Sequence, residues 1–243
     1  MKILIKIILI IQIIFPYVSS DVSGNNGVVV SSKIHASDIG ISIMKNGGNA
    51  IDAAIGVCFA LAVTHPSAGN IGGGGFMVIN FENGSSTAID FREVAPLNSK
   101  ENMFQDEEGN VIDGLSTSSI LSVGVPGTVA GMGYIHEKYA TLPWDQLLYP
   151  AFLLAKYGFE LDQHNHYLFN NLSLIDKLSK DEETRKIFIE NKIYSLNDLI
   201  VQPDLAKTLL RISKHGYKEF YFGQTADNII SCISTKTHYN QQI

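Results

Sequence analysis

The sequence has 243 residues, of which 45% are hydrophobic and 17% charged, and its formal net charge is −6. This length and composition suit one globular domain with a sizeable core and exclude a disordered or fibrous chain. The acidic balance and the lack of any basic cluster argue against nucleic acid or an anionic membrane surface as a partner.

Residues 1–20 form a separate segment. It begins with two lysines near the start, continues as an apolar run, and ends in Val18-Ser19-Ser20, whose small residues suit signal peptidase. This order is typical of a secretory signal peptide. A spanning helix needs ~20 apolar residues, whereas Lys6 and Gln12 interrupt this run. We therefore expect a secreted domain over residues 21–243, with an N-terminal membrane anchor as the alternative.

Two sequons fit the N-glycosylation pattern that secretion would make relevant. They are Asn83-Gly84-Ser85 and Asn171-Leu172-Ser173, and the first has a turn-like setting. The two cysteines do not suggest a disulfide scaffold. We expect Cys58 to be a buried thiol within an apolar helix, and a disulfide to Cys232 remains the alternative.

The first predicted elements are a strand and two helices. The β-branched run within residues 28–34 predicts a strand, and residues 36–46 predict a helix that ends at Gly47-Gly48. Asn49 can cap the next helix, where Asp52 suits the positive end of the helix dipole. Asp52 is the only charged residue between Ala50 and Val63, so this second helix belongs in a core.

A β-hairpin follows. Residues 76–81 and 87–93 read as strands joined by Asn83-Gly84, which is a strong turn signal. The alternation of a strand places Thr87, Ile89 and Phe91 on one face and Asp90 and Arg92 on the other.

The rest of the chain predicts mostly helices. The expected segments are residues 128–139, a helix from about Pro143, residues 162–180, a helix that Pro203 opens and Gly216 stops, and a short helix over residues 226–233. Few strands followed by many helices indicate an α+β or layered α/β domain.

Three motifs that suggest a cofactor or a metal fail on inspection. Gly72 to Gly75 lack the Lys-Ser/Thr of a phosphate loop and the spacing of a dinucleotide fingerprint, so we interpret them as permitting a tight turn and close helix–strand contact. His164 and His166 have no further ligands nearby in sequence, and His136-Glu137 lacks the second histidine of a zinc protease. We expect no metal and no cofactor.

Arg92 is the candidate binding residue. From the residues alone, it reads as a strand-borne partner of Asp90 or Glu93 in an ion pair. Arginine is also chemically suited to hold a carboxylate, because its planar guanidinium can donate two parallel hydrogen bonds to that group.

Three blocks of sequence together resemble the γ-glutamyltransferases, also called glutathione hydrolases. They are Gly47-Gly48-Asn49-Ala50-Ile51-Asp52-Ala53-Ala54, residues 64–78 from Thr64-His65-Pro66 through the glycine run, and Asp90-Phe91-Arg92-Glu93-Val94-Ala95-Pro96. Further matches include Val123-Gly124-Val125-Pro126-Gly127 and Phe220-Tyr221-x-Gly223, so the resemblance covers about residues 27–233.

The resemblance implies an N-terminal-nucleophile hydrolase fold, a four-layered αββα sandwich, represented here only in part by the first portion of the large subunit. It implies γ-glutamyl transfer from glutathione to water or an amino acid, with no cofactor and with Arg92 holding the α-carboxylate of the γ-glutamyl group. The family's catalytic threonine belongs to its carboxy-terminal half. Thr237-His238 echoes that segment only superficially, so we expect no catalytic residue in this chain.

Two interpretations of function remain open. The chain is either part of an active enzyme, completed by further sequence or by a separately supplied small subunit, or a secreted, catalytically inactive binding protein of the same family.

Overall fold

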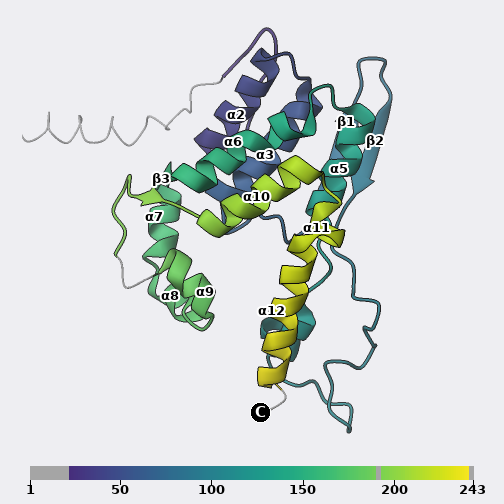
Figure 1. Ribbon diagram of the computed structural model, residues 1–243, viewed down its shortest axis with the longest axis vertical. Helices are drawn as coiled ribbons and strands as arrows, with labels where there is room; N and C mark the ends of the chain where they lie inside the picture. Colours follow the sequence, from purple (N-terminus) through teal and green to yellow (C-terminus); the bar gives the residue numbers. More distant parts are fainter. Residues whose placement is uncertain (1–21, 190–192, 241–243) are drawn as a thin grey trace, which may run out of the picture.

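The computed structural model describes residues 22–189 and 193–240 and shows a mixed α+β fold in which helices predominate (Figure 1). The helices are α2 (Ile34–Lys45), α3 (Ala50–Thr64), α4 (Leu115–Ser118), the 3-10 turn η1 (Ile120–Ser122), α5 (Thr128–Tyr139), α6 (Trp144–Tyr157), α7 (Gln163–Phe169), α8 (Leu172–Leu178), α9 (Glu182–Phe188), α10 (Pro203–His215), α11 (Glu219–Phe222) and α12 (Gln224–Asn240). The strands are β1 (Phe76–Asn80), β2 (Ser86–Asp90), β3 (Phe159–Glu160) and β4 (Leu199–Ile200).

The predicted signal peptide, residues 1–20, lies outside the described residues. Within residues 22–189 and 193–240, no helix combines the length and hydropathy needed to cross a bilayer.

The core lies in a helical stack formed by α2, α3, α6 and α10. Helix α3 packs against α2 and α6, and α10 packs against α6. The apolar sequence of α3 places this helix in the middle of the stack, as the sequence predicts, and its residues Ile55, Phe59 and Val63 are fully buried there. Leu147 and Leu209 bring the facing sides of α6 and α10 into the same core.

The amino end of α3 is fixed by a buried carboxylate. Asn49 caps the helix through the N–H groups of Ile51 and Asp52, while the Asp52 carboxylate accepts the N–H of Asn49, which completes a capping box. The same carboxylate accepts hydrogen bonds from the N–H and hydroxyl of Thr141 and from the N–H of Leu142. Asp52 therefore joins α3 to the connection between α5 and α6.

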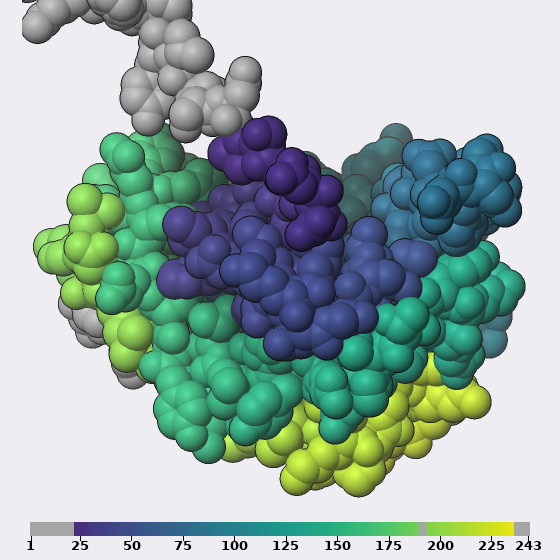
Figure 2. All heavy atoms as spheres, turned by 90° about the horizontal axis from the view of Figure 1, so that it is seen from above, coloured from purple at the N-terminus to yellow at the C-terminus, as the bar shows by residue number. Residues whose placement is uncertain are grey.

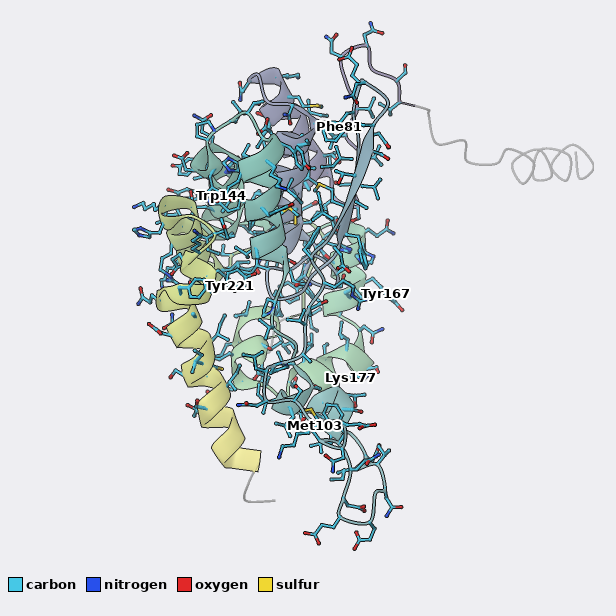
Figure 3. The ribbon with its side chains drawn as sticks, turned by 90° about the vertical axis from the view of Figure 1, so that its right-hand side faces the viewer. Phe81, Met103, Trp144, Tyr167, Lys177 and Tyr221 are labelled. Carbon is cyan, nitrogen blue, oxygen red and sulfur yellow. The ribbon has the colours of Figure 1, made fainter. Side chains whose placement is uncertain are left out.

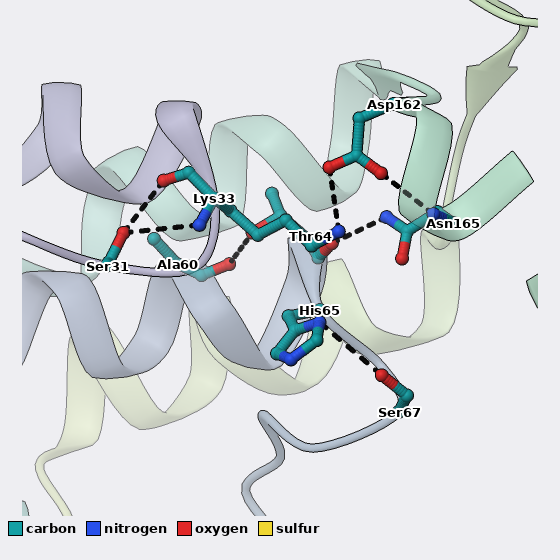
Figure 4. A network of polar contacts seen from close by, with 8 residues as sticks. All are labelled: Ser31, Lys33, Ala60, Thr64, His65, Ser67, Asp162 and Asn165. Atoms are coloured by element: carbon teal, nitrogen blue, oxygen red, sulfur yellow. Dashed lines mark hydrogen bonds and ion pairs between the residues drawn. The ribbon is translucent and has the colours of Figure 1, made fainter. Parts of the chain in front are cut away.

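At the other end of α3, two buried side-chain amides donate hydrogen bonds to the helix carbonyls, and Figure 4 shows the one from Asn165. The Asn165 side chain donates to the carbonyl of Thr64 at 2.9 Å, and the Gln202 side chain donates to that of Val63 at 2.8 Å. Nearby, the Lys33 ammonium, 3% exposed, pairs with Asp162 at 2.7 Å. Because the last carbonyls of a helix lack partners within the helix, these contacts fix where α3 ends.

The predicted hairpin is confirmed. Strands β1 and β2 are antiparallel with Phe76 opposite Asp90, and the turn between them contains Gly84 with φ of +82°. Strand β2 ends at Asp90, earlier than the predicted residue 93. Beyond it, Gly75 and Phe91 still exchange backbone hydrogen bonds, and the Asp90 carboxylate accepts the N–H of Arg92 at 2.9 Å. Seen from above, the hairpin stands out at the right of the molecule (Figure 2).

The strand predicted for residues 28–34 is wrong. Residues 28–33 lie outside helix and strand, and α2 already begins at Ile34. A β-branched run forms a strand only where a neighbour completes its hydrogen bonds, and none of the described strands pairs with this segment. Val28 and Val30 are instead 49% and 88% exposed.

Two helix predictions also need correction. Residues 162–180 form α7 and α8 as separate helices, because Asn171 accepts the N–H of Leu174 and thereby caps a new helix. The last helix, α12, begins at Gln224 and continues to Asn240, beyond the short helix predicted for residues 226–233.

Candidate functional site

Arg92 lies just beyond the end of β2, on the solvent side of the hairpin. Thr87, Ile89 and Phe91 are partly buried, whereas Asp90 and Arg92 are exposed. The predicted alternation of faces is therefore confirmed.

The predicted structural role for Arg92 is only weakly present. The Asp90 carboxylate accepts a hydrogen bond from the backbone N–H of Arg92, not from its guanidinium. The guanidinium Nε stands 3.9 Å from Glu93, and both side chains are solvent-accessible, with Arg92 65% exposed. Exposed ion pairs of this length contribute little stability. The guanidinium also lies 5.9 Å from the centre of the Phe76 ring, so its donors face solvent beside an aromatic surface.

The glycine run lies against the backbone that carries Arg92. Gly75 and Phe91 exchange backbone hydrogen bonds of 2.9 and 3.4 Å. A Cβ added to Gly74 would come within 2.5–2.7 Å of the Phe91 oxygen, Arg92 Cα and the Glu93 nitrogen. The close approach inferred from sequence is confirmed. It does not depend on left-handed backbone, because positive φ values occur at other glycines and not at Gly72 to Gly75.

A second loop, residues 123–127, closes on the same backbone. Val94 and Val125 exchange hydrogen bonds of 2.8 and 3.3 Å. A Cβ on Gly127 would lie 2.0 Å from the Phe91 oxygen, and one on Gly124 would lie 2.9 Å from Glu93 Cβ. We call residues 72–75, 91–94 and 123–127 the site loops.

The start of α5 joins the site loops together. The carbonyl of Gly73 accepts the N–H groups of Gly127 at 2.7 Å and Thr128 at 3.0 Å. The result is a backbone-to-backbone assembly of three segments that are distant in sequence, with Arg92 at its surface. The motifs in these three segments carry the family resemblance noted in the sequence. The sequence gave no sign, however, that the loop at residues 123–127 supports Arg92.

A groove of about 460 Å³ borders this assembly. Its walls include Val28 to Val30, one side of α3 with Cys58, and Gly74, Gly75 and Phe91. Both cysteines are free thiols, so the alternative of a Cys58–Cys232 disulfide is wrong. Burial raises the pKa of the Cys58 thiol to about 11, which keeps it protonated and unreactive at neutral pH.

The histidines noted in the sequence occupy a different region. His164 lies with its ring 5.4 Å from that of His65, whose Nδ1 is 3.4 Å from the Ser67 hydroxyl (Figure 4). Burial, with the charges of Lys33 and His164, lowers the pKa of His65 below its ordinary value despite the opposing effect of Asp162. Across the described residues, no group of three or more His, Cys, Asp or Glu side chains is placed to bind a metal.

The predicted glycosylation residues differ in setting. Asn83 is exposed at the hairpin turn, where its side-chain oxygen accepts hydrogen bonds from Ser85. Asn171 is half-buried, and its side chain caps α8.

The chemistry available at the site loops is anion binding. A guanidinium with five N–H donors projects from a backbone that glycine contacts hold in place, and it can receive a planar carboxylate through two parallel hydrogen bonds.

Comparison with known proteins bears on the family of the chain. The family model described as gamma-glutamyltranspeptidase matches residues 36–237. The glutathione hydrolase proenzyme of Pseudomonas sp. (strain A14) is 45% identical over 218 residues, which are 87% of this chain and 37% of that protein. The corresponding proenzyme of Escherichia coli (strain K12) is 44% identical over 211 residues, 86% of this chain and 36% of that protein.

Solved structures show the same similarity. The crystal structure of Helicobacter pylori gamma-glutamyltranspeptidase matches with a TM-score of 0.81 and 45% identity, over 86% of this chain and 60% of that one. That of the Pseudomonas nitroreducens enzyme matches with a TM-score of 0.80 and 35% identity, over 88% and 62% of the two chains. The chain spans a little over a third of the length of the curated relatives it matches.

Proposed function

The chain belongs to the γ-glutamyltranspeptidase family, and from that membership we propose that it forms the first part of the large subunit of a γ-glutamyltransferase or glutathione hydrolase. The reaction proposed is transfer of a γ-glutamyl group from glutathione to water or to an amino acid. The observation that carries the proposal is Arg92, exposed at the surface of the site loops within the matched residues.

Arg92 is proposed to bind the α-carboxylate of the γ-glutamyl donor. Its guanidinium is close to Glu93 at 3.9 Å, which is too long for a strong hydrogen bond, so a carboxylate ligand can displace that contact at small cost. Two charge-assisted hydrogen bonds would fix the direction of the donor as well as its affinity.

The nucleophile is proposed to come from the carboxy-terminal part of the family's sequence, which this chain does not span. By resemblance, that part supplies a threonine whose own amine acts as base, the N-terminal-nucleophile strategy. The second subunit is therefore the proposed partner, and no cofactor is proposed.

The four-layered αββα sandwich is proposed for the assembly that includes this second part. Two features support it: Val28 and Val30 are exposed although β-branched, and Phe76 and Val78 on β1 are 64% and 69% exposed. Additional β-strands from the second part would cover the exposed residues of both segments. A structure of the two-subunit protein that left these residues in solvent would contradict this assignment.

The first experiment assays the 243-residue polypeptide alone for product release from a γ-glutamyl anilide. We expect no release above the buffer blank, because the proposed nucleophile lies elsewhere. Turnover by the pure polypeptide would overturn that assignment, while inactivity even with a family small subunit would favour the inactive binding protein.

The decisive experiment replaces Arg92 by lysine in this chain combined with the catalytic part of a family member. Lysine keeps the charge but lacks the planar guanidinium with its two parallel N–H donors, so KM for the donor should rise about tenfold or more while kcat persists. Arg185→Lys on α9 is the matched control. An unchanged KM with a lower melting temperature would instead make Arg92 a structural partner of its neighbours.

Secretion is proposed from the pattern of residues 1–20. Intact-mass analysis of the protein recovered from the medium should show a chain that begins near Asp21. Retention of residues 1–20 in a membrane fraction would establish the alternative, an N-terminal anchor.

A further inference from the structure

The hydroxyl of Tyr221 takes the place of a missing helix cap at the start of α5. The N-cap residue, Gly127, has no side chain to offer, although the first N–H groups of a helix need acceptors. Tyr221 Oη accepts the N–H of Ala130 at 3.0 Å and donates to the carbonyl of Pro126 at 2.9 Å. One hydroxyl thus ties α5 to the loop that precedes it.

Tyr221 is itself held firmly. It projects from α11 (labelled in Figure 3), and its ring makes an edge contact with Phe220, which is 4% exposed. The preceding residue, Glu219, is buried and accepts hydrogen bonds from Thr225 while lying 3.3 Å from Arg211. These contacts connect α11 to α10 and α12. The packing of α11 therefore fixes the position of the Tyr221 hydroxyl.

The hydroxyl also keeps its proton at neutral pH. Burial raises the pKa of Tyr221, against a smaller lowering by the Ala130 N–H. A protonated hydroxyl can donate to Pro126 and accept from Ala130 at the same time, which matches the two observed bonds.

The segment that Tyr221 fixes lies directly on the backbone of Arg92. A Cβ at Gly127 would be 2.0 Å from the Phe91 oxygen, and one at Gly131 would be 2.4–2.9 Å from the Phe91 side chain. Phe91 precedes Arg92 and has little space to move independently of α5. A shift of the first turn of α5 therefore moves Phe91, and with it the base of the Arg92 side chain.

We propose that Tyr221 is a positioning residue for Arg92, acting through its hydrogen bonds to Pro126 and Ala130. The inference rests on the proposed function, in which Arg92 binds the donor's α-carboxylate. It assigns to α11 a role in donor affinity although Tyr221 touches no substrate.

The first test uses the 243-residue chain and requires no activity. Tyr221→Phe keeps the ring and removes the hydroxyl, so amide hydrogen exchange at Ala130 should accelerate about fivefold to twentyfold. Tyr134→Phe, on the exposed side of the same helix, is the matched control and should leave that rate unchanged. An unchanged Ala130 rate in Tyr221→Phe would overturn the proposal.

The second test measures donor kinetics in this chain combined with a family catalytic part. Tyr221→Phe should raise KM for a donor with a free α-carboxylate about threefold to tenfold, with kcat within about twofold. For a donor whose α-carboxylate is amidated, KM should not change. A lower melting temperature and lower kcat with unchanged KM would show a purely structural cap and overturn the proposal.

A double variant separates this inference from the function on which it rests. If Tyr221 acts through Arg92, Tyr221→Phe should add little to the KM of Arg92→Lys, and additive effects would contradict the proposal. If Arg92→Lys alone leaves KM unchanged, the proposed function fails first. If Arg92→Lys raises KM and Tyr221→Phe does not, only the positioning role fails.

Discussion

The helical stack and the site loops are held together by different forces. In the stack, fully buried apolar side chains such as Phe59 and Leu147 fill the space between helices. In the site loops, glycines bring backbone against backbone, and the contacts are hydrogen bonds such as that from Gly127 to Gly73. A change in the stack should therefore appear mainly in stability, and a change in the site loops mainly in ligand binding.

Phenylalanine truncation should show the contrast most strongly. Phe59 is 0% exposed and meets the Trp144 ring at 5.6 Å, so Phe59→Ala should lower the free energy of unfolding by about 3–5 kcal/mol. Phe76 is 64% exposed, and Phe76→Ala should change the free energy of unfolding by no more than about 0.5 kcal/mol. Urea unfolding measures both values. Equal losses would mean that the hairpin belongs to the core.

Carboxylate neutralisation should give the next largest difference. Asp52→Asn leaves some of the N–H donors of Asn49, Thr141 and Leu142 without an acceptor, so it should lower the free energy of unfolding by about 2–4 kcal/mol. Asp90→Asn still offers an oxygen to the N–H of Arg92 and should cost well under about 1 kcal/mol.

The Asp52 effect should also depend on pH. Burial alone would raise the pKa of Asp52, but hydrogen bonds from Thr141, Asn49 and Leu142 outweigh it and lower the pKa on balance. Ionised Asp52 therefore stabilises the fold fully above the unfolded pKa of 3.8, and this stabilisation is lost as pH falls through the lower folded pKa. Urea unfolding at several pH values should show the gap between wild type and Asp52→Asn shrinking in that range. A gap that widened there would contradict the direction of the shift.

Two glycines of the same run should respond oppositely to alanine. Gly74→Ala puts a Cβ against the backbone of Arg92 and should cost about 1–3 kcal/mol of stability or displace the site loops. Gly72 has open space and no positive φ, so Gly72→Ala should be neutral or stabilising by about 0.4–1 kcal/mol. Thermal unfolding and donor KM measured on both variants check this pair. Similar behaviour of the two would remove the close-approach explanation.

Glycosylation should give the smallest structural effect. In a eukaryotic secretory host, Asn83 should carry glycan more often than Asn171, because it is exposed at a turn whereas Asn171 is half-buried and caps α8. Mass analysis before and after glycosidase treatment gives both occupancies, and Asn83→Gln and Asn171→Gln assign them. Higher occupancy at Asn171 would contradict the prediction.

Some of this architecture follows from the sequence alone. The uncharged stretch of α3, its Asn49 cap and the Asn83-Gly84 hairpin are visible because helix capping, turns and face alternation depend on residues a few positions apart. The family follows in the same way from three blocks of motif, and with it the proposed role of Arg92. The failed strand at residues 28–34 shows the limit, since a strand needs a partner that local sequence does not specify.

Only the tertiary structure decided how Arg92 is supported. Gly74, Gly127 and Gly131 meet at Phe91, and Tyr221 caps α5 from a distant part of the chain. No local pattern encodes these encounters, because they depend on the path of the chain through space. The tertiary structure likewise decided that the Arg92 guanidinium stays accessible at the surface, 3.9 Å from Glu93, because no distant segment of the described residues forms an ion pair with it.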